Sequence, residues 1–284
     1  MAYKSLLSVM TDATLANGPI SQGIALAHAQ DAHFEVLCLG VDRSQTGYYY
    51  AGANAMVMQE TLARAQEEAT AIEDTAKSLL KGNGVRWSTE SGVAQIADLG
   101  RHVAAHARFA DLVILPKPYG KDRDAVELEP TIEAAMFQGQ APVLMVPEAS
   151  GATPNPVSTP KSVLVAWNES PEALRAIRAA LPFLQAAEVV HIVIIDPPAH
   201  GPNRSDPGGL ISQFLARHGV NVEIEILSKT LPRVSEVLLR HATDTSSEMI
   251  VMGAYGHSRF REAILGGATR NMLESADIPV LMAH

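Results

Sequence analysis

Four glycines near the C-terminal end of the sequence have the spacing of a loop that holds an anion. Gly253 and Gly256 follow an apolar run, and Gly266 and Gly267 stand where a helical pattern opens. Glycine lets the backbone approach a ligand without a Cβ in the way. The first N–H groups of a helix lack partners within the helix and attract phosphate. This spacing therefore predicts a phosphate-binding loop.

Polar and charged side chains accompany these glycines. Thr269 offers a hydroxyl, and Arg259 and Arg270 offer positive charge for the same anion. Two glycines alone are typical of a turn, and arginines are also typical of a solvated surface. The second glycine pair and the helix start favour the anion site. His257 lies beside Ser258, but no third member of a hydrolase triad is evident.

The elements that must position this loop alternate between short apolar runs and helical patterns. Strands that are apolar on both faces and alternate with helices indicate a parallel sheet covered on both sides. Ligands bind such sheets outside the carboxyl ends of the strands, where the strand order reverses. For the order 3-2-1-4-5 that point lies between the first and fourth strands. The expected strands are 4–10, 34–41, 85–90, 111–115 and 142–146 in the first half, and 162–167, 188–195, 221–227, 248–253 and 279–283 in the second.

The chain contains two related halves. Lys4-Ser-Leu-Leu-Ser-Val9 returns as Lys161-Ser-Val-Leu-Val-Ala166, and Pro142-Val-Leu-Met145 returns unchanged as Pro279-Val-Leu-Met282. The segment between the halves is rich in proline and small polar residues, which is typical of a linker. We therefore predict a domain at 1–148, a linker at 149–160 and a second domain at 161–284. Each domain is expected to be a doubly wound, five-stranded parallel sheet with helices on both faces.

Composition sets limits on the function. The 284 residues are 47% hydrophobic and 19% charged, which is typical of globular proteins, and the net charge of −9 argues against a nucleic-acid-binding surface. The single cysteine, Cys38, lies in an apolar run, so core packing in a reducing compartment is expected. Neither a signal peptide nor a membrane span is predicted, so the cytoplasm is the expected location. The ten histidines are interpreted as scattered, without a recognised HxxxH or HExxH pair, and no metal site is predicted.

The spacing Gly253-x2-Gly256-x9-Gly266 resembles the nucleotide-binding signature of the universal stress protein family, and Ile278-Pro-Val-Leu-Met282 resembles its final strand. The two-copy layout is similar to a tandem member. The resemblance implies a Rossmann-like or flavodoxin-like fold and, in some members, bound ATP or a related adenine nucleotide. It also implies pairing of domains through their fifth strands, and a role in stress tolerance without a defined reaction.

The second half differs from this family pattern at two positions. Asn168 stands where ATP-binding members often have Asp, and Gly267 stands where they usually have Ser or Thr. Both changes predict a weakened or altered nucleotide preference. Asn168 is expected to orient the nucleoside, and Ile195 or Asp196 to contact base or ribose, although the loop after them is also typical of a stiff connection. The complete expected cofactor-binding set is Asn168, Ile195, Asp196, Gly253, Gly256, His257, Arg259, Gly266, Gly267 and Thr269.

The first half lacks these features. Pro116 stands where the first glycine is expected, and Glu129-Pro130 stands where the second glycine pair is expected. Proline has no N–H to donate and a carboxylate repels phosphate, so this half is predicted not to bind ATP in the family manner. Asp12 does keep an acid at the end of the first strand.

The leading hypothesis is a non-enzymatic tandem stress protein. Its second domain would hold an adenine nucleotide, with Mg2+ or Mn2+ bridging the phosphates. One alternative is a weak ATPase switch, which the sequence supports less because no general base is evident. Another is an interaction protein without any ligand. The family resemblance also implies a homodimer.

Overall fold

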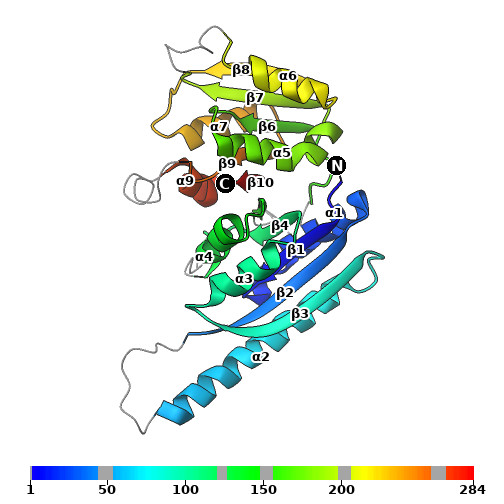
Figure 1. The fold of residues 1–284 in the computed structure, drawn as a ribbon, viewed down its shortest axis with the longest axis vertical. Helices are drawn as coiled ribbons and strands as arrows, with labels where there is room; N and C mark the ends of the chain where they lie inside the picture. The colour runs from blue at the N-terminus through cyan, green and yellow to red at the C-terminus, as the bar shows by residue number, and fades with distance from the viewer. Residues whose placement is uncertain (1, 44–53, 120–126, 148–155, 198–205, 257–266) are drawn as a thin grey trace. The chain divides into compact units, whose positions relative to one another are not determined.

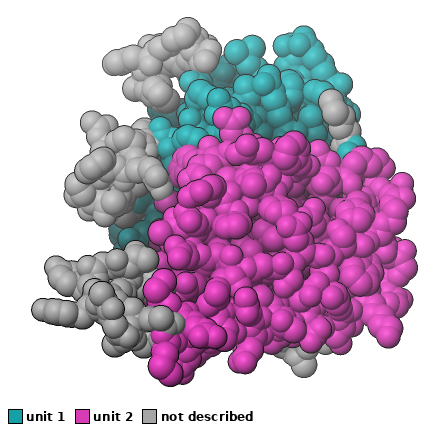
Figure 2. All heavy atoms as spheres, turned by 60° about the horizontal axis from the view of Figure 1, so that its bottom comes forward, with its two compact units in different colours: residues 1–2, 142–147, 157–284 teal, residues 3–141, 148–156 magenta. Residues whose placement is uncertain are grey.

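The computed structural model describes residues 2–43, 54–119, 127–147, 156–197, 206–256 and 267–284. The chain forms two compact units. The N-terminal unit contains residues 3–141 and 148–156, and the C-terminal unit contains residues 1–2, 142–147 and 157–284 (Figure 2, magenta and teal).

Four parallel strands form the sheet of the N-terminal unit, in the order β3-β2-β1-β4. They are β1 (Ser5–Met10), β2 (His33–Asp42), β3 (Arg86–Gln95) and β4 (Leu112–Pro116). All five residues of β4 are buried, as expected for a strand covered on both faces. The helices are η1 (Ala13–Leu15), α1 (Asn17–Gln30), α2 (Asn54–Leu80), α3 (Leu99–Ala107), α4 (Leu128–Glu133) and η2 (Ala134–Gln138).

In the long helix α2 apolar residues recur at steps of three and four, a spacing from which the sequence by itself predicts a helix. Ala65, Ala69, Ile72 and Ala76 are buried at the predicted spacing. Met58 and Leu62, which continue the stripe toward the helix N-terminus, are exposed. The apolar spacing therefore identified the helix, but the sheet covers only its later turns.

The C-terminal unit has the strand order β5-β10-β9-β6-β7-β8. This order confirms the predicted doubly wound α/β fold, because β6, β7, β8, β9 and β10 pair in parallel as 3-2-1-4-5. The helix α5 begins where the sequence indicates, since the Ser170 hydroxyl caps it and Pro171 is its first residue. The elements are β5 (Val143–Val146), β6 (Ser162–Ala166), α5 (Pro171–Ala186), β7 (Val189–Ile195), α6 (Gly209–Arg217), β8 (Val222–Leu227), α7 (Val234–Asp244), β9 (Met249–Gly253), α9 (Ala268–Ser275) and β10 (Val280–Ala283) (Figure 1).

The repeated Pro-Val-Leu-Met segments pair with each other. Strand β5 runs antiparallel to β10, with Leu144 opposite Leu281, and it belongs to the C-terminal unit. The expectation that these two strands pair is confirmed. The strands of the first half follow the predicted order 3-2-1-4-5 in the sheet, while β5, which pairs with β10, is grouped with the C-terminal unit. Pairing satisfies the backbone groups that an exposed strand edge would leave open.

The single cysteine occupies the core of the N-terminal unit, as expected. Cys38 on β2 is fully buried, and burial, followed by the nearby Glu73 carboxylate, raises the pKa of its thiol to about 12. The thiol is therefore protonated and unreactive in the folded chain. Within the described ranges, no helix combines the length and apolar character that crossing a membrane requires.

Candidate functional site

A pocket of about 480 Å3 opens at the carboxyl ends of β6, β7 and β9 in the C-terminal unit. Strand β6 lies between β9 and β7, so the pocket is at the position where the strand order reverses. This is the location that the sequence predicts for a ligand. The pocket is lined by Ala166, Trp167, Asn168, Ser170, Val193, Ile195, Val234, Leu238, Met252, Gly253, Tyr255, Gly256, Gly267, Ala268 and Thr269.

One side of the pocket is apolar. Val193 and Ile195 come from β7, Met252 comes from β9, and Val234 and Leu238 come from the first turns of α7. Of these five, only Ile195 was expected from the sequence. The α7 residues follow a helical apolar pattern that does not distinguish a pocket wall from ordinary core, so sequence alone gave no reason to select them.

The N-terminus of α5 approaches the end of β9 closely. A Cβ on Gly253 would stand 2.5 Å from the Ala173 nitrogen and 2.8 Å from the Glu172 carbonyl carbon. These are main-chain atoms that cannot rotate away. Glycine is therefore required here for helix packing, in addition to the role in ligand approach that the sequence predicts. At Gly256 the nearest atom to a Cβ is a Glu172 side-chain oxygen at 3.3 Å, so this position is less constrained.

The N-terminus of α9 forms another part of the pocket. Gly267 is the N-cap residue, with an extended ψ of 158°, and Ala268 and Thr269 follow in the first turn. Thr269 is 2% exposed, and its hydroxyl accepts the Tyr255 N–H at 3.0 Å. It thereby joins the segment after β9 to the helix. Tyr255 has φ of +55°, and the sequence analysis did not select it.

Polar groups at the end of β6 are arranged by a local turn. The Asn168 Oδ1 accepts the Ser170 N–H at 3.2 Å, and the Ser170 hydroxyl accepts the Ala173 N–H at 3.1 Å. The Asn168 amide nitrogen carries two further donors. Asn168 is therefore fixed at the pocket edge while it keeps hydrogen-bonding capacity.

The structure brings together six of the ten predicted cofactor-binding residues as pocket lining: Asn168, Ile195, Gly253, Gly256, Gly267 and Thr269. Asp196 lies outside the lining. It has φ of +45°, and its carboxylate accepts the Lys229 N–H at 3.2 Å, so it stabilises the end of β7 against the segment after β8. His257, Arg259 and Gly266 lie outside the described residues. Contact of any of the ten with a ligand stays a prediction.

The corresponding strand ends of the N-terminal unit are arranged differently. Asp12 accepts the Thr14 N–H and hydroxyl, each at 2.8 Å, and so caps η1. Pro116 ends β4. Glu129 and Pro130 lie in the first turn of α4, where the C-terminal unit has the glycine-led start of α9. This helix start presents a carboxylate and a residue without an N–H.

Ion pairs join the elements around that helix start. The Arg43 guanidinium, just after β2, contacts Glu127 at 2.7 Å and Glu68 at 2.9 Å. Glu127 is the N-cap residue of α4, and Glu68 lies on α2. Partial burial disfavours the charge, but the hydrogen bonds to Glu68 and Glu127 outweigh it and raise the pKa of Arg43. A fixed cation within the protein thus links β2, α2 and α4.

Comparison with known proteins identifies the same family as the sequence motif. Residues 160–284 match the universal stress protein family. Universal stress protein Slr1230 of Synechocystis sp. is 28% identical over 137 residues, which are 48% of this chain and 47% of that protein. The chain therefore aligns with about half the length of this curated relative.

A solved structure that aligns over nearly the whole chain shares the fold. A universal stress protein from Archaeoglobus fulgidus is 14% identical, with a TM-score of 0.73, and the match covers 98% of this chain and 96% of that one. A universal stress protein in complex with cAMP is 19% identical, with a TM-score of 0.36, over 45% of this chain and 99% of that one.

Proposed function

Residues 160–284 match the universal stress protein family, and on this premise we propose that the C-terminal unit binds ATP or a related adenine nucleotide. The chain acts as a nucleotide-binding stress-response protein without a reaction of its own. The observation that carries the proposal is the pocket between β6 and β9, which combines an apolar wall with the N-terminus of α9.

The pocket suits the two ends of a nucleotide. Its volume of about 480 Å3 lies in the range of small-molecule sites, about 300–1,000 Å3. Val193, Val234 and Leu238 offer an apolar surface to a base. The fixed Asn168 amide offers donors to the ribose.

The α9 end of the pocket suits a phosphate. Gly256 and Gly267 keep the side-chain volume low, and the first N–H groups of α9 attract an anion. The described lining contains no carboxylate, so Mg2+ or Mn2+ would be held mainly by the phosphates and water. Such an ion supplies charge neutralisation between phosphates.

The direct test is calorimetric titration of ATP into the full chain and into Gly267→Asp. Asp is a favourable N-cap residue, so it should preserve or stabilise α9, while its carboxylate would stand where the phosphate binds. Like charges about 4 Å apart cost about 4 kcal/mol at an effective dielectric constant of about 20, so we expect affinity to fall at least about 100-fold. Gly267→Ser is the matched control. It adds a hydroxyl without charge and should bind ATP at least as well as the parent chain.

The stoichiometry tests the difference between the units. One ATP per chain is expected, and it should be lost in Gly267→Asp with the melting temperature unchanged or raised. Two equal sites, or a single site that Gly267→Asp leaves intact, would refute the proposal. Nucleotide released by denaturing the purified chain would further exclude the ligand-free interaction protein.

The ATPase alternative has its own measurement. Phosphate release at saturating ATP, abolished by Gly267→Asp, would establish hydrolysis at this site. We expect none above background, because the described pocket lining offers no carboxylate or histidine as a general base.

The proposal extends to the whole chain as a tandem protein, with domains at 1–148 and 161–284 joined by 149–160, acting in the cytoplasm. The repeated strand sequences support this duplication. A homodimer would give twice the chain mass of 30.3 kDa in light scattering. Because β5 and β10 already pair within one chain, that dimer would have to use another surface.

A further inference from the structure

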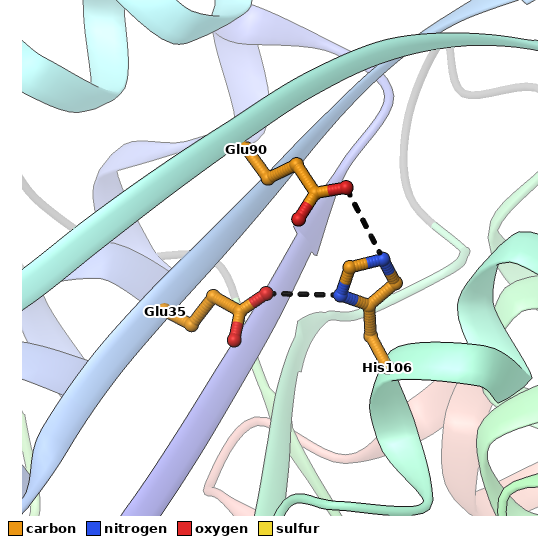
Figure 3. Close-up of side chains that lie close together, drawn as sticks. All are labelled: Glu35, Glu90 and His106. Carbon is orange, nitrogen blue, oxygen red and sulfur yellow. Dashed lines mark hydrogen bonds and ion pairs between the residues drawn. The ribbon is translucent and has the colours of Figure 1, made fainter.

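A histidine and two glutamates converge in the N-terminal unit, away from the strand ends described above. Glu35 projects from β2, Glu90 from β3 and His106 from α3 (Figure 3). Their ligand atoms lie within 4.8 Å of one another. His106 and Glu35 are partly buried, and the Glu90 side chain is 62% exposed, so the cluster is open to ions from solvent.

The contact with Glu35 fixes how His106 presents its ring. The His106 Nδ1 lies 2.9 Å from a Glu35 oxygen. An ionised carboxylate only accepts hydrogen bonds, so Nδ1 carries the proton and donates it. The other ring nitrogen, Nε2, is then the atom that can bind a metal, and it faces Glu90 (Figure 3). Metal-binding histidines are usually oriented in this way by a carboxylate on the second nitrogen.

The distance from His106 to Glu90 distinguishes a metal site from a hydrogen bond. Nε2 and the Glu90 Oε1 are 3.6 Å apart, which is longer than a normal N–H···O hydrogen bond. Two ligands of a tetrahedral Zn2+ ion, each about 2.1 Å from the metal, are about 3.4 Å apart. The separation therefore fits two atoms that share one ion.

A second histidine lies on the same helix at the spacing of a zinc pair. His102 precedes His106 by four residues in His102-Val-Ala-Ala-His106. Residues four apart on a helix share a face, and two histidines at this spacing can bind one Zn2+ ion. The expectation of no metal site overlooked this pair. His102 is exposed, so its side chain can turn toward the ion.

We propose that Glu90, His102 and His106 bind a Zn2+ ion on the N-terminal unit, and that Glu35 positions His106 through its Nδ1 proton. Two imidazoles and one carboxylate suit zinc better than Mg2+, which prefers oxygen ligands alone. Three protein ligands leave a fourth tetrahedral position for water. The site links β3 to α3 and is independent of the nucleotide proposed for the C-terminal unit.

The C-terminal unit has a related cluster that differs in one respect. Glu225 on β8 contacts both His191 on β7, at 2.6 Å, and His241 on α7. One Glu225 oxygen hydrogen-bonds to the His191 Nδ1, and the other lies in ion-pair contact with the His241 Nε2. Glu223 is 3.8 Å from His191 and 63% exposed. The short contacts leave no space for an ion between Glu225 and either ring, so this cluster supplies a matched control.

The test is titration of Zn2+, and separately Co2+, into the untagged full chain without nucleotide. We expect saturation at one Zn2+ per chain and the visible absorption of tetrahedral Co2+. Glu90→Gln and His106→Gln should each lose this absorption, and His102→Gln should weaken binding, while circular dichroism stays that of the parent. Glu223→Gln, which removes a comparable carboxylate from the other cluster, should change neither the stoichiometry nor the absorption.

The positioning role of Glu35 has a separate readout. Glu35→Ala should weaken Zn2+ binding by about 10- to 100-fold. Glu35→Gln should restore part of it, because an amide oxygen still accepts the Nδ1 proton. The proposal is overturned by absence of saturable binding, by binding that survives Glu90→Gln and His106→Gln, or by loss of binding in Glu223→Gln. Binding of one Zn2+ per two chains, together with a doubled particle mass in solution, would also overturn the proposal, because the ion would then lie at a contact between chains.

Discussion

The carboxyl ends of the strands differ sharply between the two units. In the C-terminal unit they surround a pocket, and Gly256 and Gly267 add no side chains to it. In the N-terminal unit Asp12 caps its own helix, and Glu129 and Pro130 occupy the first turn of α4. Arg43 there binds Glu68 and Glu127 instead of an external anion.

This difference shows how one fold can place different residues at the same strand ends. The strand order that creates the position is the same around β1 and around β6, so topology alone does not decide which side chains surround it. The deciding residues are the few that follow each strand or begin the next helix. A helix start with free N–H groups attracts anions, whereas one with a carboxylate and a proline repels them. The comparison leads to three predictions about stability.

The largest expected effect is at Gly253. In Gly253→Ala the new methyl group would meet the main chain of Glu172 and Ala173 at 2.5–2.8 Å, so α5 must shift. We expect a loss of about 3 kcal/mol in the free energy of unfolding of the C-terminal unit. This is near the upper end of the range that is typical when an extra methyl group is forced into a packed core. Urea denaturation monitored by circular dichroism measures it.

Two controls accompany this substitution. Gly256→Ala should change stability by less than about 0.5 kcal/mol, because only the end of the Glu172 side chain is near. The rate at which a thiol reagent labels Cys38, buried in the N-terminal unit, should stay that of the parent chain. Equal losses for the two alanine variants would show that Gly253 is not a packing requirement.

An intermediate effect is expected at Thr269. Thr269→Val keeps the shape but removes the oxygen that accepts the buried Tyr255 N–H, so about 2 kcal/mol should be lost. Thr269→Ser keeps the oxygen and should retain most of the stability. Thermal unfolding of the three chains measures the difference. If valine and serine behave alike, the hydroxyl does not hold the segment after β9 to α9.

The smallest expected effect is at Arg43. Arg43→Met removes the contacts with Glu68 and Glu127, but the Arg43 side chain is half exposed, so solvent screening limits the loss to about 1 kcal/mol. Arg64→Met is the control, since Arg64 is 80% exposed and pairs with Glu68 at 3.4 Å. It should have almost no effect. Calorimetry should still find one ATP per Arg43→Met chain, because Glu129 and Pro130 remain. A second site would mean that Arg43 alone prevents binding.

Much of the fold could be predicted because it depends on local pattern. The buried runs of β4 and β9, the Ser170-Pro171 helix start and the stripe on α2 all follow from residue order. The pocket could be placed because parallel topology fixes where strand order reverses. Sequence reasoning did not find the packing requirement at Gly253, because the close approach of α5 joins residues far apart in the chain.

The amino-acid sequence by itself determined the alternation of strands and helices, the two related halves, and the loss of backbone donors at Pro116 and Pro130. Only the tertiary structure decided that β5 joins the C-terminal unit, that the Thr269 hydroxyl accepts the Tyr255 N–H, and that Glu35 and Glu90 lie on either side of His106. The physical reason is the distance along the sequence between the residues that interact. Periodicity and missing N–H groups act within a few residues, whereas these contacts depend on how distant strands and helices pack.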